Sequence, residues 1–415
     1  MGKLRGSRVD AVDRRGVVRN PDLAAAGARL RAAQGAVRQM ELDTGVQYSA
    51  NAAVQRARVS EQGFLPPPFA GESYNLIDVS LGVSYSLDWW GRNRALVSAA
   101  ANAARSEEAE QAAARLAVAA LVADAYFALA NAQAQELLAQ QQLEKRRTAL
   151  AIEQSHLDRG LASPYLVRVA EQALAHTEDA VRRSGYEVRA WRYRLALATG
   201  RSPDQAQTLP KAQLPAPVAL PSVLPLDWLA RRPDVVAQRW RVQAAGDVSD
   251  ATRAEFYPNV NLLLLVGLES KSASQLLSRS ASTGSLGAAV HIPAFNVNNL
   301  QNRLGTREAE YAVAVGEYNR TVLDAARQVV DSYAALDAWE QREAFQQHAL
   351  KAADQVEALS VSRYRNGLTG RSESLGAEIS SLSQRQRETE TRAAQLRASV
   401  ALFHALGGSW EPSQE

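Results

Sequence analysis

The most constraining feature of this sequence is a stretch of 68 residues, Arg92–Arg159, that contains neither glycine nor proline. These are the two strongest helix breakers, and the stretch is rich in good helix formers such as Ala, Leu, Glu, Gln and Arg. A single helix of this length would be about 100 Å long, at about 1.5 Å per residue. Because no compact soluble domain contains such a rod, the sequence predicts partner helices along its whole length.

The rod belongs to a pattern that occurs twice in the chain. Matching segments follow one another in the same order, which indicates an internal duplication of about 200 residues. At offsets of 205–212, Asn20-Pro21-Asp22-Leu23 recurs as Arg232-Pro233-Asp234-Val235, Leu81-Gly82 as Leu286-Gly287, Val122–Leu129 as Val329–Leu336, and Gly160 and Gly200 as Gly367 and Gly407.

We therefore expect two repeats, each with a helix, a strand hairpin, a long helix and a shorter helix. The first repeat (1–200) has helix Pro21–Thr44, a hairpin at about 46–88, and helices 92–158 and 165–199. The second (233–407) has helix Pro233–Phe256, a hairpin at about 259–293, and helices 299–365 and 373–406. Between them, the proline-rich segment 201–232 is interpreted as an extended linker with little regular structure, and 408–415 as a tail.

The strand Val79–Asp88 alternates apolar and small or polar residues, which predicts one oily and one wet face. Its length suits a transmembrane strand. We expect the oily face to meet lipid, with Trp89 and Trp90 as interfacial anchors; a soluble sheet with one buried face is the alternative. The predicted lipid-facing residues are Leu81, Val83, Tyr85 and Leu87, and the predicted lumen residues are Ser80, Gly82, Ser84 and Ser86.

Two hairpins supply only four strands, and a small barrel needs about eight. Three further strands complete these hairpins: Tyr48–Arg56, Val260–Leu268 and Leu286–Pro293. The first of them alternates poorly between apolar and polar residues, and the second is apolar on both faces. An open sheet edge is not tolerated in lipid. The sequence therefore predicts that other copies complete the sheet, and three copies would give twelve strands.

The composition narrows the range of functions that this chain could have. The chain has no cysteine, five scattered histidines, and 47 basic against 44 acidic residues. Thiolate metal sites and a cysteine nucleophile are excluded, a histidine metal cluster is not expected, and the charge balance does not suit a nucleic-acid partner. Because the common enzyme signatures are also absent, we expect neither catalysis nor a cofactor.

Four motifs resemble the TolC-like outer membrane efflux proteins, in particular the lipoprotein branch that serves drug and metal efflux pumps. They are Tyr85–Arg92 (YSLDWWGR) at the strand-to-helix junction, Leu229–Val235 (LARRPDV) opening the second half, Ala254–Pro258 (AEFYP) before the third strand, and Ala401–Trp410 (ALFHALGGSW) at the end. The resemblance spans residues 20–411. It implies a mainly helical homotrimer, with a twelve-stranded barrel in the outer membrane and a helical tunnel in the periplasm.

The resemblance also implies partners and sites. The tunnel tip would dock a periplasmic adaptor and an inner-membrane pump, and the protein would be a passive exit duct. We expect the turns at Gly160 and Gly367 to form this tip, with Leu161 and Leu368 as adaptor contacts. Ser372, Glu373 and Gly376 match the family's gate, where three copies of Glu373 would form an acidic ring; a role in capping the helix is the alternative.

The chain also departs from the family pattern. Its start lacks the signal peptide and acylated cysteine of family members, so we expect a misplaced start or a truncated gene. The gate residues differ from the usual ones, so the gate is expected to be held less tightly or by different contacts. Two other functions stay open: an exit duct for type I protein secretion, and a coiled-coil-like scaffolding protein.

Overall fold

The glycine- and proline-free stretch Arg92–Arg159 forms one continuous helix, and a second long helix continues through Gly305 and Gly316. The structure is a computed structural model that describes residues 20–64, 66–216, 227–408 and 410. Its helices are α2 (Pro21–Thr44), α3 (Arg92–Asp158), α4 (Pro164–Ala198), α5 (Asp227–Arg231), α6 (Pro233–Ala254), α7 (Val297–Arg365) and α8 (Arg371–Ala405). The strands are β1 (Gln47–Arg58), β2 (Ser73–Leu87), β3 (Asn259–Ser270) and β4 (Ser282–His291).

The chain divides into two compact units that cut across the repeats. The sheet unit comprises Arg29–Glu108 and Ala237–Asn319. The described residues of the helical unit lie within Met1–Ala28, Ala109–Val236 and Arg320–Glu415. Each unit therefore draws segments from both halves of the sequence.

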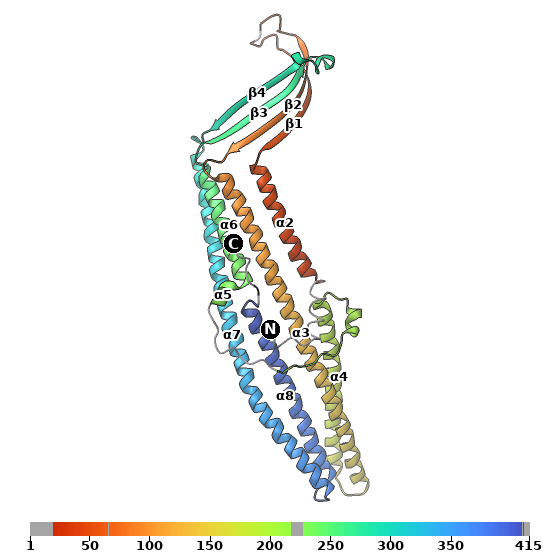
Figure 1. Cartoon of the computed structure of the whole chain (residues 1–415). Helices are drawn as coiled ribbons and strands as arrows, with labels where there is room; N and C mark the ends of the chain where they lie inside the picture. The colour runs from red at the N-terminus through yellow and green to blue at the C-terminus, as the bar shows by residue number, and fades with distance from the viewer. Residues whose placement is uncertain (1–19, 65, 217–226, 409, 411–415) are drawn as a thin grey trace. The chain divides into compact units, whose positions relative to one another are not determined.

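The sheet unit contains one antiparallel sheet in chain order, β1-β2-β3-β4 (Figure 1). Ser84 of β2 pairs with Gln47 of β1 and Leu263 of β3, and Leu263 pairs in turn with Gly287 of β4. Strand β2 begins six residues before the predicted Val79 because its extra residues pair with the end of β1. Strand β4 ends at His291 and not at the predicted Pro293, whose nitrogen has no hydrogen to donate to a ladder.

The helical unit is held by a core in which α3, α4 and α8 meet. Residues 125–130 of α3 are all buried, and Leu195 of α4 and Leu396 of α8 pack with them. A smaller cluster joins Leu336 of α7 to Leu402 of α8. Figure 1 shows α3 beside α4 and α7 beside α8.

Helix α3 also contains the apolar run Leu116–Ala123, which by itself is shorter than the roughly 20 residues of a membrane-spanning helix. Helix α3 has an 18-residue window with a mean hydropathy of 1.6, which by length and composition could cross a membrane; 39% of that window is buried. Val118, Val122 and residues 125–130 of α3 are buried in the core that includes α4 and α8, so we attribute that part of its apolar character to packing between helices.

The proline-rich segment is more regular than predicted. Pro203–Thr208 forms a 3-10 helix, and Ala206 and Leu209 are buried in the helical core. Asp227–Arg231 forms the short helix α5. Apolar side chains spaced among the prolines explain the difference, since they anchor the segment. Pro217, Pro221 and Pro225 lie outside the described residues, as do residues 1–19 and most of the predicted tail.

Candidate functional site

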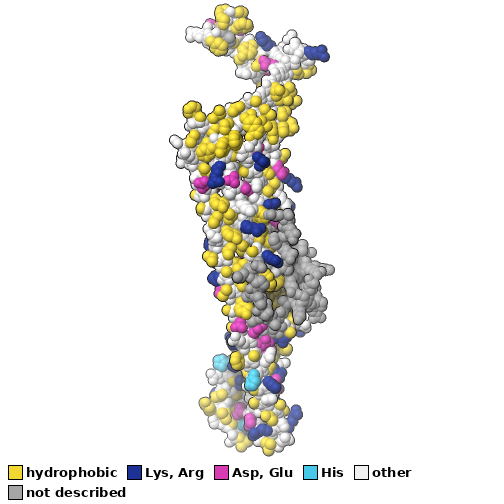
Figure 2. All heavy atoms as spheres, turned by 60° about the vertical axis from the view of Figure 1, so that its left-hand side comes forward, with side chains coloured by type: hydrophobic (Ala, Val, Ile, Leu, Met, Phe, Trp, Pro, Cys, Tyr) yellow, Lys and Arg dark blue, Asp and Glu magenta, His cyan; other side chains and the backbone are white. Residues whose placement is uncertain are grey.

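The sheet has one apolar and one polar face. Residues paired directly across antiparallel strands point to the same side, so the register assigns every side chain to a face. Over the rows Val79–Leu87 of β2, one face carries only apolar side chains apart from Ser282 and Gly284; beyond those rows the same face also carries Arg56, Arg58, Ser73, Asn75 and Ser270. Figure 2 shows hydrophobic side chains gathered over the strands. The apolar face consists of Tyr48, Ala50 and Ala52 of β1, Val79, Leu81, Val83, Tyr85 and Leu87 of β2, Val260, Leu262, Leu264, Val266 and Leu268 of β3, and Leu286, Ala288 and Val290 of β4.

The four residues predicted to face lipid, Leu81, Val83, Tyr85 and Leu87, all lie on this face. The predicted lumen residues, Ser80, Gly82, Ser84 and Ser86, lie on the other. The pairing also explains why β1 and β3 were difficult to interpret alone, because their faces become clear only beside β2.

Trp89 and Trp90 follow Asp88 just after the end of β2, and both are exposed. The Trp90 ring stacks on Tyr257 with centroids 4.5 Å apart, and Trp90 Nε1 donates a hydrogen bond to the Pro258 carbonyl at 2.9 Å. The junction after β2 is thereby fixed to the junction before β3. Amphipathic rings of this kind suit the interface between membrane and water.

The outer strands leave both sheet edges open. Among the described residues, β1 pairs only with β2, and β4 pairs only with β3. Each edge therefore presents a row of backbone N–H and C=O groups that a further strand could pair with.

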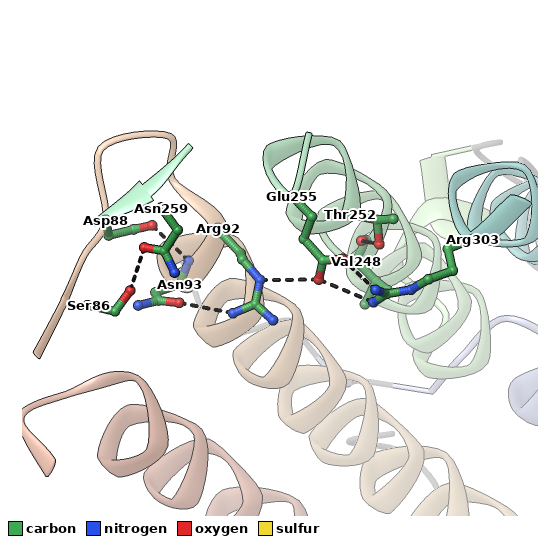
Figure 3. A network of polar contacts seen from close by, with 9 residues as sticks. All are labelled: Ser86, Asp88, Arg92, Asn93, Val248, Thr252, Glu255, Asn259 and Arg303. Atoms are coloured by element: carbon green, nitrogen blue, oxygen red, sulfur yellow. Dashed lines mark hydrogen bonds and ion pairs between the residues drawn. The ribbon is translucent and has the colours of Figure 1, made fainter. Parts of the chain in front are cut away.

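A polar network lies where the strands meet the helices (Figure 3). Glu255 follows α6, and its side chain is only 16% exposed. It accepts hydrogen bonds from Arg92 of α3 at 3.2 Å and from Arg303 of α7, whose Nη1 lies 2.8 Å from Glu255 Oε2. One carboxylate thus joins three helices of the sheet unit. The sequence analysis included Glu255 in a motif but did not assign it this role.

Asp88 caps the start of α3 in the same network. Its carboxylate accepts hydrogen bonds from the backbone N–H groups of Asn93 and Arg94, at 2.9 and 3.0 Å. These donors have no partner inside the helix, so an acid at this position stabilises the first turn. The network explains why an acid follows β2 in the junction motif.

The turns at Gly160 and Gly367 have the same geometry. Each glycine has φ +71°, a left-handed conformation that glycine adopts without steric cost. The N–H of Gly160 donates to the Leu157 carbonyl, and that of Leu161 donates to the His156 carbonyl. Gly367 and Leu368 repeat both bonds in the second turn. This is the Schellman motif, and it leaves Leu161 and Leu368 74% and 69% exposed.

The predicted gate residues lie in the first turns of α8. Ser372 donates a hydrogen bond to Glu153 of α3 at 2.8 Å. Glu373 is exposed, and no hydrogen bond or ion pair involves its side chain among the described residues. A Cβ atom added at Gly376 would meet nothing within 4 Å, so packing inside one chain does not require glycine there.

The acid with the most contacts in this region is Glu378, which the sequence analysis missed. Its side chain is 8% exposed and lies 2.6 Å from both Lys145 of α3 and Arg371 of α8. Ser374, which is fully buried, donates to the same carboxylate at 3.2 Å. Burial by itself raises the pKa of Glu378, but hydrogen bonds and charge from Lys145 and Arg371 outweigh it and lower that pKa. The sequence did contain a signal for this burial, because the charged Glu378 lies on the same helix stripe as the apolar residues Leu375, Ile379 and Leu382.

Comparison with known proteins identifies the family. The family model described as "Outer membrane efflux protein" matches the chain twice, at residues 17–201 and 224–408. The chain belongs to the outer membrane efflux protein family. It is accordingly an outer membrane efflux channel protein, and the two matches correspond to the internal duplication.

Individual relatives cover most of the chain. It is 27% identical to the multidrug resistance outer membrane protein MdtP of Escherichia coli (strain K12), across 99% of this chain and 86% of that protein. It is 30% identical to the fusaric acid resistance protein FusA of Burkholderia cepacia, across 70% of this chain and 56% of that protein. The crystal structure of the outer membrane protein VceC from Vibrio cholerae matches with a TM-score of 0.86 and 28% identity, covering 98% of this chain and 97% of that one.

Proposed function

We propose that three copies of this chain form a passive exit duct, through which small molecules delivered by an inner-membrane pump and a periplasmic adaptor leave the cell. The observation that carries the proposal is the four-stranded sheet, with one apolar face and two open edges. Pairing β1 of one copy with β4 of the next removes every edge and turns the apolar faces to lipid. A passive role of this kind needs no catalytic residue and no cofactor.

Helix α7 supports the assembly independently. Within the helical unit it exposes six large hydrophobic side chains, and all of them except Tyr364 lie at spacings close to multiples of 3.6 residues and share one stripe. Large apolar side chains exposed along one line of a helix suit contact with a neighbouring molecule. We assign the stripe to a neighbouring copy: Leu323, Val330, Phe345, Val356 and Leu359.

The names of the relatives favour small molecules as cargo over protein. One relative is named for multidrug resistance and another for fusaric acid resistance. The partner that selects the cargo would be the pump, because the duct itself is passive.

The assembly is tested by its mass in mild detergent. We expect a particle of about three times 44.9 kDa that unfolds on dissociation, because the open edges and the α7 stripe cannot persist in water. A stable, fully folded monomer at high dilution would contradict the proposal.

The turns at Gly160 and Gly367 are the proposed adaptor-docking tip, since each presents an exposed leucine from the same rigid turn. Changing both Leu161 and Leu368 to Glu should abolish efflux while leaving trimer formation and membrane insertion intact. The matched control changes Arg159 and Asn366 to Glu, which puts acids on the same exposed turns without removing an apolar side chain. Full efflux in the leucine double variant would remove the docking assignment.

The proposed periplasmic gate comprises Ser372, Glu373 and Gly376. Support comes from the exposed, unpaired Glu373 carboxylate and from the open space beside Gly376. In a trimer, three carboxylates near one axis would attract cations and repel anions.

A further inference from the structure

Strand β3 contains four consecutive leucines, Leu262–Leu265, and the register divides them between the two faces. Leu262 and Leu264 lie on the apolar face, paired with Tyr85 and Val83 of β2. Leu263 and Leu265 lie on the polar face, paired with Ser84 and Gly82. Over the rows Val79–Leu87 of β2, these two leucines are the only large aliphatic side chains on the polar face.

Nothing within the sheet covers this pair. Its neighbours in β4 are Gly287 and Ser285, and its neighbours in β2 are equally small. A Cβ atom added at Gly287 would meet no atom within 4 Å. Leu263 and Leu265 are 49% and 40% exposed, so both side chains stand above a floor of small residues.

A neighbouring copy does not cover the pair either. Leu263 and Leu265 belong to β3, which has β2 on one side and β4 on the other. Copies that join through β1 and β4 pair with the edge strands and leave the face of β3 open. If the apolar face meets lipid, as in the proposed channel, the leucine pair stays in the water-filled lumen.

We infer that Leu263 and Leu265 form a solute-contacting patch in the lumen, which binds the apolar part of amphipathic molecules as they leave. This inference rests on the proposed channel function. A wall that only conducts polar solutes has no use for large aliphatic side chains, whereas a pair of leucines offers apolar contact to a solute that carries such surface. In a trimer the patch occurs three times and forms an apolar belt.

Block of ionic current in planar bilayers tests the patch. Tetramethylammonium and tetrahexylammonium, added from the side nearer the barrel, carry the same charge and differ in apolar surface. In the unaltered channel we expect tetrahexylammonium to block at much lower concentration. Changing Leu263 and Leu265 to Ala should raise its half-blocking concentration by about tenfold, the effect of losing one or two buried methylene contacts. The weak block by tetramethylammonium should not change.

The matched control changes Leu262 and Leu264 to Ala, which removes the same apolar side-chain atoms from the opposite face of the same strand. It should conduct and be blocked like the unaltered channel. Equal block by both ions in the unaltered channel, or an unchanged half-blocking concentration in the Leu263/Leu265 variant, would overturn the inference and leave the channel itself standing. Absence of any current from the unaltered trimer would instead count against the proposed function.

Discussion

Asn20 and Arg232 occupy the same place in the two repeats and perform one task with different chemistry. Asn20 accepts a hydrogen bond from the N–H of Asp22 and donates one to the carbonyl of Ala198, the last residue of α4. Arg232 donates to the carbonyl of Ala405, the last residue of α8, at 2.7 Å, and its guanidinium pairs with Asp234 at 2.6 Å. In each repeat, the residue before the first helix therefore donates a hydrogen bond to a backbone carbonyl at the end of the last helix.

The adjacent arginines Arg231 and Arg232 allow a matched test of this contact. The Arg232 side chain is 4% exposed and makes several hydrogen bonds in fixed directions, which the single ammonium of lysine cannot reproduce. We expect Arg232→Lys to lower the free energy of unfolding by about 2–3 kcal/mol. Arg231 is exposed, so Arg231→Lys should change it by less than about 0.5 kcal/mol. Denaturant unfolding of the two variants in detergent compares them directly.

The buried carboxylate of Glu378 predicts a dependence of stability on pH. Because its pKa is lower in the folded chain than in the unfolded one, it stabilises the fold above the unfolded pKa of about 4.3. That contribution disappears as the pH falls through the folded pKa. Glu378→Gln should therefore cost about 1–2 kcal/mol at pH 7, a modest value because Lys145 and Arg371 are partly exposed.

Thermal unfolding at several pH values checks this prediction. The difference between the unaltered protein and Glu378→Gln should be present at pH 7 and shrink below about pH 4. Glu373→Gln, which changes an exposed acid of the same helix, should show no such difference. A gap for Glu378→Gln that stays constant to pH 3 would mean that the amide disturbs packing and that ion pairing is not the cause.

At the scale of single elements, the two faces of β2 predict unequal effects from neighbouring substitutions. Val83 lies on the apolar face and Ser84 on the polar face. Arginine at position 83 should cost roughly 2–4 kcal/mol near the middle of the bilayer, and arginine at position 84 much less. Membrane insertion and trimer yield measure both. Equal damage at the two positions would indicate a sheet buried on both faces.

The helices and strands also show how much of the structure could be predicted from the sequence. The absence of glycine and proline was enough to predict α3, because helix propensity is local. Assigning the side chains of β1 and β3 to faces required the pairing register between strands, which depends on residues far apart in the sequence. Glu378 could not be recognised as buried, because Lys145 lies 233 residues away in the chain and only tertiary packing brings the two together. The contact between Arg232 and Ala405 was missed for the same reason.

At the scale of the whole molecule, the proposed gate requires three copies acting together. If three Glu373 carboxylates surround one axis, Glu373→Gln should lower the preference for cations and weaken block by divalent cations. Reversal potentials across a salt gradient in planar bilayers measure this preference. Glu373 also lies in the first turn of α8, where no side-chain capping bond is present. Unchanged selectivity with a small loss of thermal stability would leave only its interaction with the helix dipole.

The open edges of β1 and β4 have a consequence for how the protein is made. A newly synthesised chain carries two unpaired edges as soon as its sheet forms, and such edges aggregate with any strand they meet. Lipid does not accept them either, so insertion and assembly have to occur as one event. Channel formation should therefore accelerate more steeply than linearly with the supply of chains. If the chain assembles as proposed, it has no stable state between synthesis and the trimer, and we expect its biogenesis to need a chaperone that shields strand edges.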